Sequence, residues 1–232
     1  MAQLAQVDWS PIWISLATSI FATLVVFLAA LPLAAWRERQ HTPAMAIIDG
    51  LFLLPLVLPP TVVGFFLLLL FGRNGFIGQL LLRLGTSVVF TWPATVIAAA
   101  VVAFPLMYLT ACAAFEQIDA HLLQAARTLG ASEWRVFREI MLPLAWPGVF
   151  AGTILTFARA LGEFGATLML AGNIPGKTAT IPIAIYFAVE SNDLDAAYVW
   201  CAIDVLISLS LLAGLYYWTH NQMRGLARTA RR

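Results

Sequence analysis

The chain has 232 residues, of which 61% are hydrophobic and 11% are charged, and its formal net charge is +1. Soluble domains carry about 25% charged residues, so this composition excludes an ordinary soluble protein and indicates one that lies within a lipid bilayer. A mean hydropathy of +0.86 agrees with this assignment, and we expect no nucleic-acid partner.

Five apolar segments are long enough to cross a bilayer, because about 20 helical residues span its hydrocarbon layer of roughly 30 Å. We expect helices, since an isolated helix satisfies its own backbone hydrogen bonds in lipid. The segments cover residues 11–36, 46–71, 88–115, 146–171 and 196–219. The fold class is therefore all-α, with residues 1–232 forming a single transmembrane domain and residues 116–145 forming a loop.

The first segment is interpreted as a retained span, because it lacks a basic region before it and exceeds the 7–15 apolar residues of a signal peptide. Two further apolar pieces, residues 76–84 and 181–189, are too short to cross and suit interfacial or re-entrant helices. A sixth span results if one of these two pieces enters the membrane deeply.

The second segment contains three prolines near its middle, at positions 55, 59 and 60. Each proline removes a backbone donor, and lipid offers no substitute partner for the carbonyl groups that this leaves free. Interrupted helices often mark transport sites, so Pro59, Pro60 and Thr61 are candidates for lining or gating a path. A plain kink that only shapes packing remains an equal alternative.

The loop between the third and fourth segments contains a polar island, QAARTLGASEWRVFREIMLP, at residues 124–143. Asp119 is expected to cap a helix that runs through Leu129. Gly130 suits the left-handed residue that ends such a helix. Ser132 is then expected to cap a second helix, whose positively polarised start favours Glu133.

The second helix of the island has an apolar face, formed by Trp134, Phe137, Ile140 and Met141. We expect the helix to stop at Pro143, because a proline disfavours helix at the residue before it. Taken by themselves, these residues favour a pair of amphipathic helices that lie on an anionic membrane surface.

The fourth and fifth segments contain charged residues, which are costly inside a membrane and mark functional candidates. Arg159 and Glu163 are four residues apart, so they can pair on one helix face. Asp204 lies at a similar depth, so Arg159 could bridge to either acid. We favour a neutralising network beside the path over a direct ligand, because an unpaired carboxylate would repel an anionic substrate and a lone arginine would hold it too tightly.

The distribution of basic residues predicts the orientation. With the N-terminus outside and five crossings, nine arginines face inward and three basic residues face outward, as the positive-inside rule expects. The inner set is Arg37, Arg39, Arg127, Arg135, Arg138, Arg224, Arg228, Arg231 and Arg232, and the outer set is Arg73, Arg83 and Lys177. The polar island and the C-terminus are therefore expected to be cytoplasmic.

The island resembles the EAA loop of ABC importer permeases, whose pattern is Glu-Ala-Ala, a glycine four residues later, and a subsequent Ile-x-Leu-Pro. Gln124 replaces the glutamate of that pattern. The resemblance implies a coupling helix that sits in a groove on a cytoplasmic ATPase subunit. The residues expected to form this ATPase-coupling loop are Gln124, Ala125, Ala126, Gly130, Ala131, Ser132, Glu133, Trp134, Ile140, Leu142 and Pro143.

Four other segments resemble molybdate ABC transporter permeases: LPLVLPPTVVG (54–64), GRNGFIG (72–78), FARALGEFGATLML (157–170) and NIPGKTATIPIAIY (173–186). Sulfate permeases are similar around ALGEFGA, so tungstate and sulfate remain alternative substrates to molybdate. The resemblance implies a bacterial inner-membrane homodimer, two ATPase subunits that bind ATP and Mg, and an extracytoplasmic oxyanion-binding protein.

This chain lacks the G-x-x-x-x-G-K-[ST] phosphate loop, so we expect it to bind no nucleotide, cofactor or metal itself. It also lacks HExxH and G-x-S-x-G motifs, so we expect a transport subunit with no catalytic residues. The alternative is an ion-coupled secondary transporter, which would use Glu163 and Asp204 as its coupling site and would not need an ATPase.

Overall fold

The computed structural model describes residues 8–38, 40 and 42–229, and the regular structure in these residues is entirely helical. Arg39, Arg231 and Arg232, which contribute to the predicted charge bias, lie outside the described residues. The helices are α1 (Ser10–Glu38), α2 (Pro43–Val57), α3 (Pro60–Phe71), α4 (Phe76–Arg83), α5 (Trp92–Glu116), α6 (Ala120–Thr128), α7 (Glu133–Val136), α8 (Leu142–Leu161), α9 (Gly165–Ala171), α10 (Ile181–Glu190) and α11 (Leu194–Thr229).

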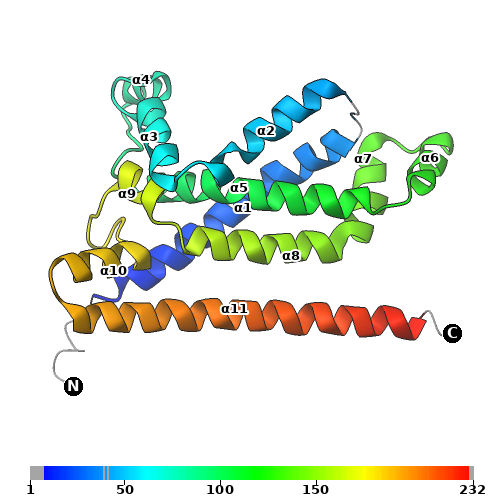
Figure 1. Ribbon diagram of the computed structural model, residues 1–232. Helices are drawn as coiled ribbons and strands as arrows, with labels where there is room; N and C mark the ends of the chain where they lie inside the picture. Colours follow the sequence, from blue (N-terminus) through cyan, green and yellow to red (C-terminus); the bar gives the residue numbers. More distant parts are fainter. Residues whose placement is uncertain (1–7, 39, 41, 230–232) are drawn as a thin grey trace.

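The core lies between α1, α5 and α8, which pack side by side (Figure 1). Small residues line much of it: Ala22, Ala30 and Ala34 on α1 and Ala99 and Ala103 on α5 are fully buried. Small side chains let helix backbones approach closely within a membrane, where packing and not water exclusion drives association. The composition of these two helices therefore explains why they form the centre of the bundle.

The predicted fold class is confirmed. Among the described residues, four helical stretches are long and apolar enough to cross a membrane, and the bent pair α2–α3 makes a fifth if it counts as one span. The four stretches are Ser10–Glu38, Trp92–Glu116, Glu133–Leu161 and Leu194–Gly214. The short pieces predicted at 76–84 and 181–189 form α4 and α10, which are eight and ten residues long.

The expected stop at Pro143 is wrong. The helix that begins at Glu133 continues through a widened π segment, Phe137–Met141, into α8 and ends at Leu161. Pro143 occupies the first turn of α8. A proline cannot donate the usual hydrogen bond to the residue four positions back, and the preceding π segment, with its longer hydrogen-bond spacing, accommodates it without ending the helix.

The predicted fourth segment, 146–171, also differs from the structure. The chain leaves the helix after Leu161, and a new helix, α9, starts at Gly165. The long helix is thus displaced toward the polar island, and its membrane-spanning candidate is Glu133–Leu161. Composition missed this break because the residues on both sides of it are equally apolar.

Helices α3 and α9 pack closely through small residues. A Cβ atom added to Gly64 on α3 would lie 2.7 Å from Cα of Ala166 and 2.8 Å from Cβ of Met169. These distances are shorter than real Cβ contacts, so the helices can approach only because position 64 has no side chain. By contrast, a Cβ added to Gly50 on α2 would meet no atom within 4 Å.

We predict that Gly64→Ala separates α3 from α9 and destabilises the protein, by about 1–3 kcal/mol if the overpacked site relaxes as cores usually do. Gly50→Ala is the matched control, and it should leave stability unchanged or raise it, because alanine favours helix. Thermal unfolding of the purified protein in detergent measures both variants. Equal midpoints for Gly64→Ala and the wild type would contradict the packing described here.

Candidate translocation path and coupling loop

The first limb of the loop is helix α6, and its predicted caps are confirmed. The side chain of Asp119 accepts a hydrogen bond of 2.8 Å from the backbone N–H of His121. Gly130 follows the helix with a φ of +81°, a left-handed conformation that side chains disfavour. Gln124, Ala125 and Ala126 lie on α6 and precede this turn.

The second limb begins at Ser132, whose hydroxyl accepts a hydrogen bond of 3.4 Å from the backbone N–H of Arg135. An ion pair ties the two limbs together across the turn, because Nε of Arg127 lies 2.9 Å from Oε1 of Glu133. Both side chains are substantially exposed, so the pair fixes geometry more than it adds stability. Sequence reasoning placed both residues but missed their contact, which only the turn at Gly130 creates.

The tip of the loop is exposed and its base is packed. Leu129 and Trp134 are 88% and 66% exposed, although both are large and apolar. Ala126, Ala131, Ile140 and Leu142 instead pack against the main core, and Pro143 is exposed at the start of α8. Exposed apolar side chains gathered on a protruding turn are typical of a surface that binds another protein.

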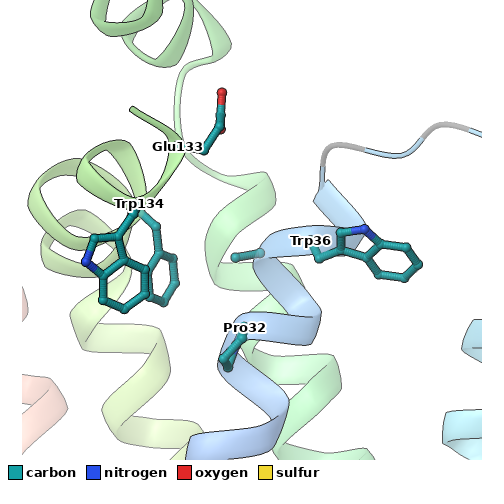
Figure 2. A pocket seen from close by; sticks show the side chains of 6 residues that line it. Pro32, Trp36, Glu133 and Trp134 are labelled. Carbon is teal, nitrogen blue, oxygen red and sulfur yellow. The ribbon is translucent and has the colours of Figure 1, made fainter. Parts of the chain in front are cut away.

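Helices α6 and α7 lie at one end of the bundle, the end at which α11 finishes, whereas α1 begins at the opposite end (Figure 1). At the end of the bundle where the loop lies, a hollow of about 180 Å³ separates α7 from the last turns of α1. Figure 2 shows Trp134 on α7 and Pro32 and Trp36 on α1 around it. The loop therefore contacts the bundle through an incompletely filled, mainly apolar seam.

Two helix interruptions meet at the other end of α8. The chain bends by 113° between α2 and α3, at Leu58 and Pro59, and this bend shows that the prolines interrupt the helix instead of only kinking it. Pro60 then opens α3, where its missing N–H costs no hydrogen bond. A Cβ added to Gly165, the first residue of α9, would lie 3.2 Å from Cβ of Pro60 and from Cγ2 of Thr61.

The sequence predicted these two regions separately, and the structure brings them together. Helices α3 and α9 both start where the two breaks meet, and Thr61 is exposed beside the break that follows α8. Backbone without regular hydrogen bonds is tolerated at membrane depth only where protein covers it or a cavity lies beside it. The meeting point of the two breaks is therefore the best candidate for the path.

The charged pair at the end of α8 is confirmed. Nη1 of Arg159 lies 2.9 Å from Oε2 of Glu163, whose side chain is only 2% exposed. The other carboxylate oxygen accepts a hydrogen bond of 2.9 Å from the backbone N–H of Ala166, within the first turn of α9. Glu163 thus neutralises the arginine and caps α9, and sequence reasoning foresaw only the first of these roles.

Asp204 on α11 does not join this pair. Within the described residues, its Oδ1 atom is buried and has no hydrogen-bond partner. Arg159 keeps 29% of its side chain exposed while it pairs with Glu163. A partly exposed and largely neutralised cation can attract an anion transiently without holding it tightly. No group of His, Cys, Asp and Glu side chains in the described part of the chain could hold a metal ion.

The chain is similar to named transport proteins and to solved transporter structures. The chain is 47% identical over 185 residues to the molybdenum transport system permease protein ModB of Escherichia coli (strain K12), covering 79% of this chain and 81% of that protein. It is 44% identical over 212 residues to ModB of Haemophilus influenzae, covering 89% and 92% of the two chains.

A chain of the bacterial alginate ABC transporter, solved in complex with an alginate pentasaccharide-bound periplasmic protein, superimposes with a TM-score of 0.76. The match covers 95% of this chain and 81% of that chain at 18% identity, so it supports the fold alone. Residues 26–224 match the family model described as the binding-protein-dependent transport system inner membrane component. This chain therefore belongs to the family of inner membrane components of binding-protein-dependent transport systems.

Proposed function

We propose that this chain is the transmembrane permease subunit of an ATP-driven ABC importer and forms the path for molybdate. The observation that carries the proposal is the continuous helix Glu133–Leu161, which joins the loop at one end to Arg159 at the other. At about 1.5 Å per residue, its 29 residues extend roughly 43 Å. A tilt of the loop would therefore move the far end of this helix, next to the two helix breaks.

The substrate proposal rests on the relatives, which are named as molybdenum transport permeases. The site is compatible with an oxyanion, since the exposed part of Arg159 supplies positive charge and Glu163 keeps that charge from binding too tightly. Tungstate and sulfate remain the alternatives to be tested. The comparisons lend no support to an ion-coupled secondary transporter.

The partners follow from the family. A binding-protein-dependent system needs a binding protein on the outer side of the membrane and an ATPase on the cytoplasmic side. Because that separate subunit hydrolyses the ATP, this chain is a transport subunit and not an enzyme. The complex contains two copies of this chain, two ATPase subunits that hold ATP and Mg, and an extracytoplasmic oxyanion-binding protein. The exposed loop tip, with Leu129 and Trp134, is the surface offered to the ATPase.

In this complex the N-terminus faces outward and the C-terminus faces the cytoplasm. The charge bias supports this orientation, as does the placement of the loop and the end of α11 at one end of the bundle (Figure 1). ATP binding draws the two coupling loops together and opens the path outward, where the binding protein releases its anion. Hydrolysis returns the permease to the inward-facing state, so the two sites are linked through two global conformations.

The proposed function is tested with the purified complex in liposomes. We expect the ATPase subunits to co-purify with this chain, and molybdate-loaded binding protein to stimulate both ATP hydrolysis and uptake. Parallel assays with tungstate and sulfate decide the substrate. Uptake that continues without ATP would contradict the proposal and favour an ion-coupled transporter.

Gly130 tests the coupling loop. We predict that Gly130→Val leaves membrane insertion intact but abolishes ATPase association, because a β-branched residue resists a φ of +81° and redirects the second limb. Gly130→Asn should retain association, since asparagine tolerates this conformation. Gly85 has a φ of +74° at the far end of α4, and Gly85→Val is the control for strain away from the loop. Pull-down of the ATPase measures all three, and full association of Gly130→Val would refute the assignment.

Arg159 tests the path. We predict that Arg159→Ala lowers assembly and uptake more than Glu163→Gln does, because it leaves a carboxylate that is 2% exposed without its counter-ion. Such a loss usually costs about 3–5 kcal/mol. Glutamine at position 163 still accepts the hydrogen bond from Ala166, and Arg159 remains partly solvated. The double variant should assemble better than Arg159→Ala. Normal assembly and uptake by Arg159→Ala would show that the charge pair is dispensable.

A further inference from the structure

A second charged cluster lies at the loop's end of the bundle, outside the candidate path. Arg37, in the last turn of α1, places Nε 3.3 Å from Oδ2 of Asp49 on α2. Its Nη1 atom donates a hydrogen bond to Oε1 of Glu116, the last residue of α5. The hydroxyl of Tyr108 donates a 2.5 Å hydrogen bond to the other oxygen of Asp49. One guanidinium group thus joins three helices.

The two carboxylate partners of Arg37 connect the base of the coupling loop to α2. Glu116 ends α5 and stands three residues before Asp119, the cap of α6, so it forms the base of the coupling loop. Asp49 lies on α2, whose far end leads directly into the 113° bend before α3. Arg37 therefore lies on a second route from the loop to the path, separate from the helix Glu133–Leu161.

Between this cluster and the bend, α2 is packed only loosely. A hollow of about 370 Å³ separates parts of α1, α2 and α5, and Pro55 lines it. Phe52 contacts two aromatic side chains of α5, with ring centroids 5.4 Å from Phe104 and 5.2 Å from Tyr108. A helix with space beside it can move as a unit, and the contacts at its cytoplasmic end decide what it moves with.

An ordinary surface ion pair would explain the cluster only in part. Exposed pairs contribute about 0–1 kcal/mol to stability, and Arg37 and Glu116 are 31% and 50% exposed. However, the arginine engages carboxylates on two different helices, and Asp49 is further fixed by Tyr108. The planar guanidinium group of arginine binds two partners at once and fixes their relative positions, which a flexible lysine cannot do.

We propose that Arg37 is a positioning residue of the transport cycle. It ties the base of the coupling loop at Glu116 to Asp49, so that α2 follows the loop and carries its movement to the bend before Thr61. This inference rests on the proposed function, because it assigns a route for the movement that the ATPase imposes. This role requires no contact of Arg37 with the ATPase or with the anion.

The first test measures molybdate transported per ATP hydrolysed in the reconstituted complex. We expect Arg37→Gln to retain ATPase association and basal hydrolysis but to lower this ratio at least about 5-fold, the lower range of coupling between sites. Arg37→Lys should fall between Arg37→Gln and the wild type. Arg83→Gln removes an exposed arginine at the end of α4 and should leave the ratio unchanged. An unchanged ratio in Arg37→Gln would overturn the proposal.

Stability is controlled by a second variant. Arg37→Gln combined with Asp49→Asn and Glu116→Gln removes the junction without leaving an unpaired charge, so it is expected to fold if Arg37→Gln does not. The triple variant should show the same low ratio. A wild-type ratio in it would equally overturn the proposal.

A distance measurement separates this inference from the proposed function. Spin labels at the exposed positions Ile47 on α2 and Gln117 after α5 are introduced with Cys112→Ala and Cys201→Ala. In the wild-type junction we expect their separation to stay constant between nucleotide-free and ATP-bound complexes, and to change in Arg37→Gln. Equal changes in both would overturn the junction. Constant separation together with no ATP-driven molybdate uptake would instead overturn the proposed function alone.

Discussion

The structure depends on the constraint that lipid cannot satisfy a free backbone group. Two helices are interrupted within the apolar part of this chain, at Leu58–Pro59 and at residues 162–164. They pack against each other through Gly64 and Gly165, so protein covers one side of each break, while Pro59, Thr61 and Gly162 stay exposed. Glu163 adds a hydrogen bond to the start of α9 and a counter-charge to Arg159. The two breaks together give the bundle a place where a path can open beside packed protein.

At the opposite end of the molecule, the loop has a defined shape and an exposed tip. The turn at Gly130 and the Arg127–Glu133 pair fix the angle between α6 and α7. The helix that starts at Glu133 then runs without a stop to Leu161, and Arg37 ties the base of the loop to α2. Both connections end at the paired breaks, so one movement of the loop would act on α8 and α2 together.

Much of this organisation could be predicted from local patterns. Long apolar runs gave the bundle, the Asp119 and Ser132 caps gave the loop's two limbs, and four-residue spacing gave the Arg159–Glu163 pair. The failures concern properties that local patterns do not contain. A π segment carries the helix past Pro143, because its longer hydrogen-bond spacing accommodates the missing N–H group. The closeness of α3 to α9, and of Arg37 to acids on two helices, depends on chain topology, which residue spacing does not encode.

The proposed mechanism requires that the state of the loop determines from which side of the membrane the paired breaks can be reached. Its most direct test is labelling of Thr61→Cys, with Cys112 and Cys201 replaced by alanine, by a membrane-impermeant maleimide applied to either side of the reconstituted complex. Thr61 is exposed at the start of α3. We expect labelling from the cytoplasmic side without nucleotide and from the outer side when ATP is trapped. Labelling that ignores the nucleotide state, or no labelling from either side, would contradict it.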